Sequence, residues 1–247
     1  MQIQTIKTHR IEPYESLEKI LEQYCLNIAE EDIVIITSKI LSVIEGRIVK
    51  KDIISKVDLI NQEADYVLES NSNPYNIYLT IKNNILIPSA GIDESNVDDV
   101  YVLYPKDIQS KAIFIWEYLR KKFSIERLGI VITDSHTTIM RKGVTGIALG
   151  WCGFEPLYSY VNKPDIYGRP LRITQINILD SLASSAVFLM GEGDEQTPLA
   201  IIKNAPKISF CNIPPSIEEE NSIKISIEED LYAPLLLSAK WVKTYKN

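Results

Sequence analysis

Two short, uninterrupted apolar runs constrain the fold of this chain more than any other feature of its sequence. Ile33 to Ile36 are all β-branched, and a similar run extends from Gly129 to Ile132. Runs of this kind are typical of strands that are buried on both faces of a sheet. The second run ends abruptly in Thr133-Asp134-Ser135-His136-Thr137-Thr138. We therefore expect a buried strand over 128–133, followed directly by a polar loop.

The remaining pattern mixes helices and strands without strict alternation, which indicates the α+β class. Helical spacing of apolar residues predicts helices over 15–29, 56–69, 107–122 and 175–190, and a last helix that begins at Glu228. Further strands are predicted over 3–7, 84–88, 99–104 and 199–203, and loops over 72–76, 89–96 and 190–198. We expect a core over residues 1–203 and a C-terminal extension over 204–247, which packs on the core or is continuous with it.

Composition and charge exclude several classes of protein. The chain has 247 residues, a net charge of −7 and no basic stripe, so binding to nucleic acid is not expected. Three widely spaced cysteines predict neither a disulfide framework nor a zinc site, and they favour a reducing cytoplasm. The N-terminal residues lack the apolar core of a signal peptide, and no apolar run is long enough for a membrane span.

Four segments carry acids, hydroxyls or small residues where an apolar element ends: 37–39, 91–96, 133–135 and 191–195. Carboxylates and hydroxyls are the ligands that Mg²⁺ and Mn²⁺ prefer, and two such ions can bridge nucleotide phosphates. Three of these segments also have an ordinary structural interpretation. Asp93 and Asn96 could cap a helix, Asp134 could mark a strand exit, and 190–195 could be an acidic surface turn. No GxxxxGK[ST] or GxGxxG motif occurs, so neither a P-loop nor a Rossmann site is predicted.

Taken together, these segments resemble the coenzyme F-420-0:gamma-glutamyl ligase family. The resemblance extends from about residue 32 to residue 203, and the motifs AGIDxSN and MGEGDExxP, in this order and spacing, are specific to the family. The matching segments are DIVIITSKILSVIEGR (32–47), SAGIDESN (89–96), GIVITDS (129–135), DIYGRPLRIT (165–174) and DSLASSAVFLMGEGDEQTPLAII (180–202).

The resemblance implies an amide ligase with an α+β fold that works as an intertwined homodimer. Such a ligase adds L-glutamate in γ-linkage to a small-molecule acceptor, a deazaflavin coenzyme precursor, through an acyl phosphate, with GTP or ATP as cosubstrate. The implied ligands of two Mg²⁺ or Mn²⁺ ions are Asp93, Asp134, Ser135 and Glu192, of which the three acids form the catalytic set. The implied nucleotide contacts are Ser38, Lys39, Asn96, Met190, Gly191, Gly193, Asp194 and Glu195.

The chain departs from the family pattern at the proposed acceptor end of the site. Ser135 replaces a usual threonine, and 136–140 read His-Thr-Thr-Ile-Met where members have Phe-Gly-Arg-Pro-Trp. Asp134 and the Ser135 hydroxyl remain, so we predict that catalysis is kept. The change removes an arginine and a stacking surface, so the acceptor could be either the deazaflavin precursor or a folate. Candidate acceptor contacts are His136, Thr137, Arg141 and Arg169, although Arg169 could equally pair an acid in its own turn.

A second departure leaves a second interpretation open. Val43 stands where the family often has a lysine that contacts the nucleotide. Loss of that cation could change the choice of nucleotide or the strength of its binding. The alternative is therefore a non-catalytic homologue that binds nucleotide or metal without forming an amide.

Overall fold

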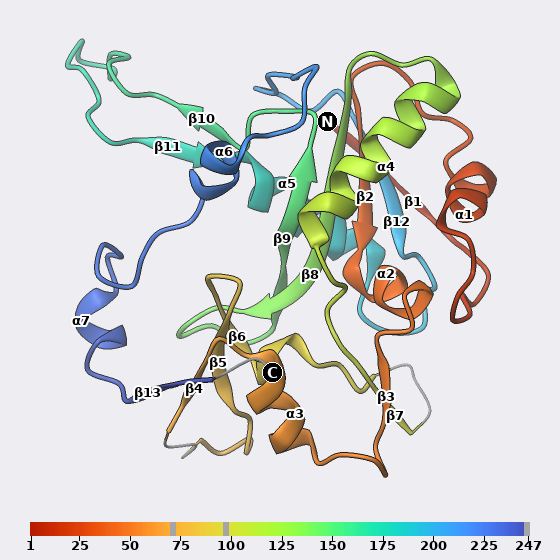
Figure 1. Ribbon diagram of the computed structural model, residues 1–247. Coiled ribbons are helices and arrows are strands. Elements are labelled where there is room, and N and C mark those ends of the chain that lie inside the picture. The colour runs from red at the N-terminus through yellow and green to blue at the C-terminus, as the bar shows by residue number, and fades with distance from the viewer. Residues whose placement is uncertain (70–72, 96–98, 245–247) are drawn as a thin grey trace.

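A five-stranded mixed sheet forms the centre of the molecule. The computed structural model describes residues 1–69, 73–95 and 99–244 (Figure 1). In spatial order the strands are β1 (Gln2–Ile6), β12 (Leu199–Lys203), β2 (Asp32–Thr37), β8 (Leu128–Thr137) and β9 (Val144–Cys152). β2 and β8 run parallel, whereas the other neighbours in this sheet run antiparallel.

Helices cover both faces of this sheet, which explains the continuous apolar run in β2. Val34 and Ile36 belong to one core cluster, together with residues of α1 (Leu17–Tyr24), α2 (Ser38–Ile44) and α4 (Ile108–Phe123). Ile33 and Ile35 belong to a second cluster, which packs against α5 (Ile178–Met190). Successive side chains of a strand point to opposite faces, so a strand between two helical layers must be apolar at every position.

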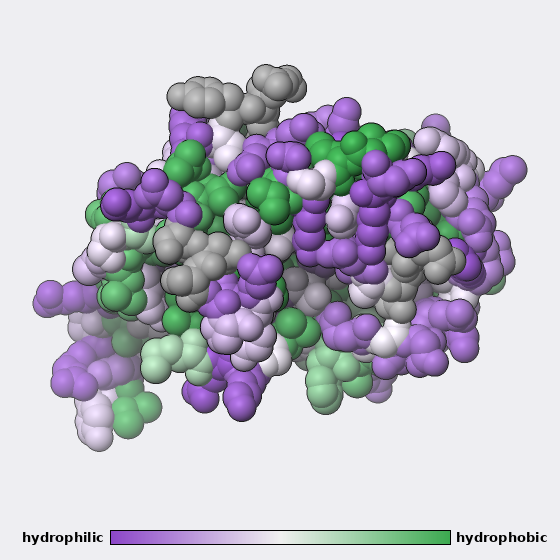
Figure 2. Space-filling view, turned by 90° about the horizontal axis from the view of Figure 1, so that it is seen from below, coloured by the Kyte–Doolittle hydropathy of each residue, from purple (hydrophilic) through white to green (hydrophobic). Residues whose placement is uncertain are grey.

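A smaller unit with its own apolar core lies below the central sheet in Figure 1. Its four-stranded antiparallel sheet has the order β13 (Trp241–Lys243), β4 (Tyr66–Leu68), β5 (Leu79–Lys82) and β6 (Ile85–Pro88). The same unit contains α3 (Lys56–Glu63), the 3₁₀ turn η1 (Ser89–Gly91) and the strand pair β3 (Ile48–Lys50) and β7 (Val100–Val102). Seen from below, hydrophilic and hydrophobic residues are mixed on the surface of the molecule (Figure 2).

Two further segments extend from the central sheet. β10 (Leu157–Ser159) and β11 (Gln175–Asn177) pair in an antiparallel hairpin that projects from the body in Figure 1, and we call residues 157–177 the arm. The C-terminal residues form α6 (Ile217–Asn221) and α7 (Ala233–Leu236) and then return to the smaller unit, where β13 pairs with β4. The division of the chain at residue 203 stays a prediction.

The α+β class is confirmed, and so are most of the predicted elements. The helix predicted over 107–122 is α4, and the one predicted over 175–190 is α5, although its first three residues form β11. The helix predicted over 15–29 is shorter, since α1 spans Leu17–Tyr24. The prediction over 56–69 is wrong in its second half, because α3 ends at Glu63 and Tyr66–Leu68 form β4. The last helix begins at Ala233 rather than at Glu228.

The predicted polar loop after residue 133 is also corrected. β8 continues through Asp134, Ser135 and His136 to Thr137, because β9 pairs with it along this whole length. The register shifts between Ile132 and Thr133, which marks an irregularity where the buried part of the strand meets the polar part. The polar residues are therefore held in an extended ladder rather than in a loop.

No helix in the described part of the chain has both the length and the apolar character needed to cross a membrane. The cytoplasmic location favoured by the cysteine content stays a prediction.

An ion network joins three segments of the smaller unit. Glu63 at the end of α3 pairs with Arg47 at 2.8 Å and with Lys82 of β5 at 2.6 Å. Burial raises the pKa of Glu63, but the Lys82 ammonium and the Arg47 guanidinium outweigh burial and lower this pKa overall. The Lys82 side chain is only 6% exposed, so its charge depends on a nearby carboxylate.

We expect Glu63→Gln to lower the free energy of unfolding by about 3 kcal/mol, because it removes the negative charge shared by two partly buried cations. Urea denaturation of the full chain measures this loss. The matched control is Glu69→Gln, which breaks an exposed pair with Lys240 at 3.8 Å and should cost less than about 1 kcal/mol. Equal losses in the two variants would contradict a structural role for the buried network.

Candidate functional site

The carboxyl ends of β2 and β8 bring two of the predicted segments together. In the parallel pairing of these strands, Thr37 lies opposite Thr133. Ser38 and Lys39, at the start of α2, therefore follow one strand at the same edge of the sheet where Asp134 and Ser135 follow the buried part of the other. The carboxyl edge of parallel strands is a usual place for ligand sites in sheets covered by helices.

The loop after β6 brings a third segment to this edge. Asp93 forms a bridge with Val102, with a backbone hydrogen bond of 2.9 Å in each direction. Lys39 forms an ion pair with Asp93 and donates to the Ser95 hydroxyl at 3.1 Å. The Ser95 amide and hydroxyl donate to Asp93 Oδ1 at 2.7 and 2.8 Å. Burial raises the pKa of Asp93, but Lys39 and Ser95 together lower it, so this carboxylate is ionised.

The loop between α5 and β12 supplies the fourth segment. Ser135 donates from its hydroxyl to Glu192 Oε2 at 3.3 Å, which links this loop to β8. Gly191 has a φ of +82°, a backbone conformation that favours glycine. Partial burial of the carboxyl group raises the pKa of Glu192, although the residue as a whole is exposed.

Asp134 is the acid most strongly perturbed by its surroundings. Burial of the carboxyl group raises the pKa of Asp134 to about 6, although the residue as a whole is only half-buried. The negative charge of Asp93 adds to this effect. The Tyr104 hydroxyl, the Ser135 backbone and the Lys39 ammonium act in the opposite direction. We call Lys39, Asp93, Asp134, Ser135 and Glu192 the polar cluster. The pKa values of Asp134 and Glu192 are both raised, so a bound cation would stabilise their ionised forms.

The donor groups of the polar cluster suit a hard cation. Carboxylate and hydroxyl oxygens are the preferred ligands of Mg²⁺ and Mn²⁺. In this conformation, however, no three His, Cys, Asp or Glu side chains in the described ranges converge closely enough to hold a metal ion. The Lys39 ammonium supplies the positive charge to Asp93 instead. Asp93 would therefore have to turn away from Lys39 before it could serve as a metal ligand.

The predicted nucleotide contacts lie on two elements that meet at the polar cluster. Ser38 and Lys39 begin α2, and the other group belongs to the α5–β12 turn: Met190, Gly191, Gly193, Asp194 and Glu195. The Gly193 amide donates to Glu195 at 2.8 Å, and the Thr197 hydroxyl donates to the Met190 carbonyl. These hydrogen bonds within the turn stabilise its conformation. Asn96 lies outside the described residues.

The predicted acceptor contacts are divided between two places. His136 and Thr137 lie at the end of β8, where the His136 ring is 3.1 Å from the Thr145 carbonyl of β9, and Arg141 lies in the turn that follows. Arg169 lies on the arm, where it forms a 2.8 Å ion pair with Asp165. This is the pairing in its own turn that the sequence left open as an alternative.

The structure adds Tyr104, which the sequence analysis did not include among the site residues. Its hydroxyl is buried and close to Asp134. Its sequence signal is an aromatic residue with a polar tip at the end of the apolar run 100–104, directly before Pro105.

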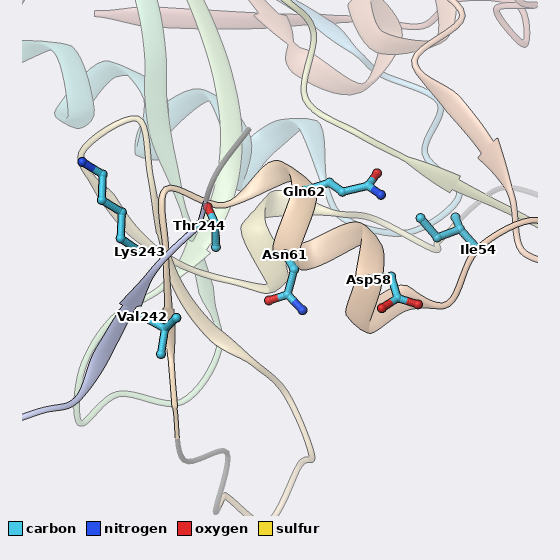
Figure 3. A pocket seen from close by; sticks show the side chains of 7 residues that line it. All are labelled: Ile54, Asp58, Asn61, Gln62, Val242, Lys243 and Thr244. Carbon is cyan, nitrogen blue, oxygen red and sulfur yellow. The ribbon is translucent and has the colours of Figure 1, made fainter. Parts of the chain in front are cut away.

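A separate pocket lies between α3 and β13, away from the polar cluster (Figure 3). Its lining residues are Ile54, Asp58, Asn61, Gln62, Val242, Lys243 and Thr244. It includes none of the predicted site residues. We assign it no role.

Comparison with known proteins agrees with the family resemblance of the sequence. The family model described as F420-0:Gamma-glutamyl ligase matches residues 5–204. A coenzyme F420:L-glutamate ligase of Methanocaldococcus jannaschii is 32% identical over 80% of this chain and 84% of its own length. Proteins of the same name are 31% identical in Methanococcus maripaludis, over 77% and 82%, and 29% identical in Methanosarcina mazei, over 78% and 81%. The chain therefore belongs to the F420-0:gamma-glutamyl ligase family.

Proposed function

We propose that this protein is a nucleotide-dependent ligase that adds L-glutamate in γ-linkage to a small-molecule acceptor. The enzyme class, a ligase that forms a C–N bond between an acid and an amino acid, follows from membership of the family. The observation that supports the rest is that segments far apart in the sequence meet in one polar cluster. These segments hold a lysine, three carboxylates and a hydroxyl, the groups that phosphoryl transfer requires.

Each member of the polar cluster has a role in this proposal. Asp93, Asp134, Ser135 and Glu192 would hold two divalent cations. A bound Mg²⁺ or Mn²⁺ would neutralise charge on the phosphates of GTP or ATP. Lys39 would exchange its partner Asp93 for a phosphate, and the glycines of 191–193 would let the backbone approach the nucleotide closely.

The reaction divides into two steps, neither of which needs a covalent bond to the enzyme. The acceptor carboxylate attacks the γ-phosphorus of the nucleotide, forming an acyl phosphate as the nucleoside diphosphate leaves. The neutral amine of glutamate then attacks the acyl carbon, forming the amide bond as inorganic phosphate leaves, and the amine gives up its proton. Lys39 stabilises negative charge on phosphate oxygens, which is the main contribution that a protein makes to this chemistry.

The acceptor in this proposal carries a terminal carboxylate, as the deazaflavin precursor and folates both do. The relatives are named for coenzyme F420. In this chain the end of β8 that follows Ser135 carries His136 and Thr137 and leads into an exposed turn with Met140 at its tip. This turn has no arginine–tryptophan pair for an anionic, flat acceptor, so a changed acceptor is the finer part of the proposal.

The proposal includes a homodimer. Large apolar side chains are exposed on the arm, where Ile166 is 91% and Ile173 is 87% exposed, and on α5, where Phe188 is 84% exposed. Apolar groups this exposed on neighbouring elements are typical of a surface that another chain covers. A second copy of this chain is the partner that we propose.

We expect the purified protein with Mg²⁺ or Mn²⁺, GTP or ATP, and glutamate to add one glutamyl residue to its acceptor, detected by mass spectrometry. Parallel reactions would contain the deazaflavin precursor, dihydropteroate or a reduced folate. Asp134→Asn should reduce the rate by about 100-fold or more, because it removes a proposed carboxylate ligand of the cations that neutralise the phosphate charge. The matched control is Asp52→Asn, which changes an exposed acid outside the polar cluster.

The outcomes of this assay separate the alternatives. Product with the deazaflavin precursor would mean that the altered residues 136–140 leave the usual reaction unchanged. Product only with a pteroate or folate would mean that they mark a change of acceptor. Nucleotide binding without product in any reaction would favour either a different acceptor or the non-catalytic homologue. An Asp134→Asn protein as fast as the wild type would refute the assigned role of the polar cluster.

The raised pKa of Asp134 predicts a pH-dependent stability in the metal-free protein. The folded pKa is about 6, above the usual 3.8, so the unfolded chain loses this proton first as the pH rises. Ionisation of Asp134 therefore lowers the free energy of unfolding between about pH 4 and pH 6, and the loss is complete above that range. Asp134→Asn should raise Tm by about 2–6 °C at neutral pH and leave it unchanged below about pH 4. Calorimetry in the presence of EDTA measures both, and a constant difference across this range would contradict the argument.

Light scattering coupled to gel filtration should give twice the chain mass of 28.1 kDa. Phe188→Glu should shift the protein towards the monomer, because it places a charge in the covered apolar surface. Ile53→Glu, at an exposed apolar residue in the turn before α3, should leave the mass unchanged. A wild-type protein that is monomeric at micromolar concentration would contradict the proposed dimer.

A further inference from the structure

Tyr104 carries a buried hydroxyl that has no hydrogen-bond partner. The residue is 3% exposed, and its hydroxyl is the single buried side-chain polar atom in the described part of the chain that lacks a partner. A phenylalanine would fill the same space without leaving a polar atom unsatisfied. Because unsatisfied buried hydroxyls are costly and rare, packing alone does not explain this tyrosine.

The ring of Tyr104 is fixed from two directions. On one side it lies against Gly91, where an added Cβ would overlap the ring atoms. Lys82 places its ammonium 5.4 Å from the ring centroid. Gly91 and Lys82 therefore limit the positions that the ring, and with it the hydroxyl, can take.

The backbone of Tyr104 is fixed as well. Arg47 donates from Nε to the Tyr104 carbonyl at 3.0 Å, and Glu63 joins Arg47 to Lys82. Two residues earlier in the chain, Val102 exchanges two backbone hydrogen bonds with Asp93. The segment that carries Tyr104 is thus anchored both to the ion network and to the loop that carries a polar-cluster acid.

The hydroxyl lies close to two acids of the polar cluster. The Asp134 carboxylate lies beside it, and Asp93 is near enough to act on it electrostatically. The approach to Asp134 favours the ionised carboxylate, although it falls short of hydrogen-bond geometry in this conformation. Asp93 already has an ion pair with Lys39 and a hydrogen bond from Ser95. Of these two acids, Asp134 is therefore the one that can accept a hydrogen bond from the Tyr104 hydroxyl.

We propose that Tyr104 is a positioning residue for Asp134: its hydroxyl donates a hydrogen bond to this carboxylate and so fixes which oxygen the carboxylate offers to a divalent cation. This inference rests on the proposed function, because it takes Asp134 as a cation ligand. A hydrogen bond to a metal-binding carboxylate fixes the orientation in which the carboxylate binds the cation. Tyr104 follows Leu103, which lies in the core of the smaller unit, but its own side chain packs in the core cluster that borders the central sheet.

The test is Mn²⁺ binding to full-length Tyr104→Phe, followed by the electron paramagnetic resonance signal of free Mn²⁺, with and without GTP or ATP. We expect the affinity for Mn²⁺ to fall about 10- to 100-fold, while Tm without metal is unchanged or higher. The matched control is Tyr101→Phe. Tyr101 is a buried tyrosine of β7 in the core of the smaller unit, and its ring faces Lys51 at 5.5 Å. This variant should bind Mn²⁺ as the wild type does.

A double variant shows whether Tyr104 acts through Asp134. Adding Tyr104→Phe to Asp134→Asn should cause no further loss of Mn²⁺ affinity, because the group that it positions is already changed. Equal affinity in the wild type and Tyr104→Phe would overturn the inference and leave the proposed function standing. Equal losses in Tyr104→Phe and Tyr101→Phe, or independent losses in the double variant, would also overturn it. A wild-type protein that binds no Mn²⁺, even with nucleotide, would refute the proposed cation site and this inference together.

Discussion

The parallel pairing of β2 with β8 is the constraint on which the rest of the site depends. Both strands are covered by helices on both faces, so their inner residues are apolar and their register cannot slip without burying polar groups. With the register fixed, Lys39 follows β2 at the same edge of the sheet where Asp134 follows the buried part of β8. The two loops that bring Asp93 and Glu192 then only have to reach this edge. Lys39 contacts Asp93 and Ser95 of the first loop, and Ser135 contacts Glu192 of the second.

Much of this arrangement could be predicted from the sequence, because it is encoded in local patterns. The apolar run of Ile33 to Ile36 predicted a doubly covered strand, and the small and acidic residues after several apolar elements predicted where the polar cluster lies. Other elements depend on distant partners. Asp134 to Thr137 stay extended only because β9 pairs with them, and the three-residue strand β4 exists because β5 and β13 lie beside it. Tyr104 ends an apolar run, but its position beside Asp134 depends on contacts between distant segments, so the sequence analysis did not select it.

Electrostatics explains why the polar cluster can exist in a folded protein without further charge compensation. Asp93 is matched by Lys39, and the remaining acids keep raised pKa values, so part of their charge can be avoided by taking up protons. The ionised acids lower the free energy of unfolding at neutral pH, and the same carboxylates are the proposed ligands of a cation. Function and stability therefore oppose one another at this edge of the sheet, as is common where acids are gathered for catalysis.

The pairing of β13 with β4 has a consequence for the order in which the protein folds during synthesis. The residues of β4 leave the ribosome early, whereas those of β13 follow more than half a chain later. Until then β4 has a free edge, although β5 and β6 are already present to pair on its other side. An unpaired strand edge is a site where nascent chains associate wrongly. The smaller unit is therefore the part of the molecule that we expect chaperones to protect for longest.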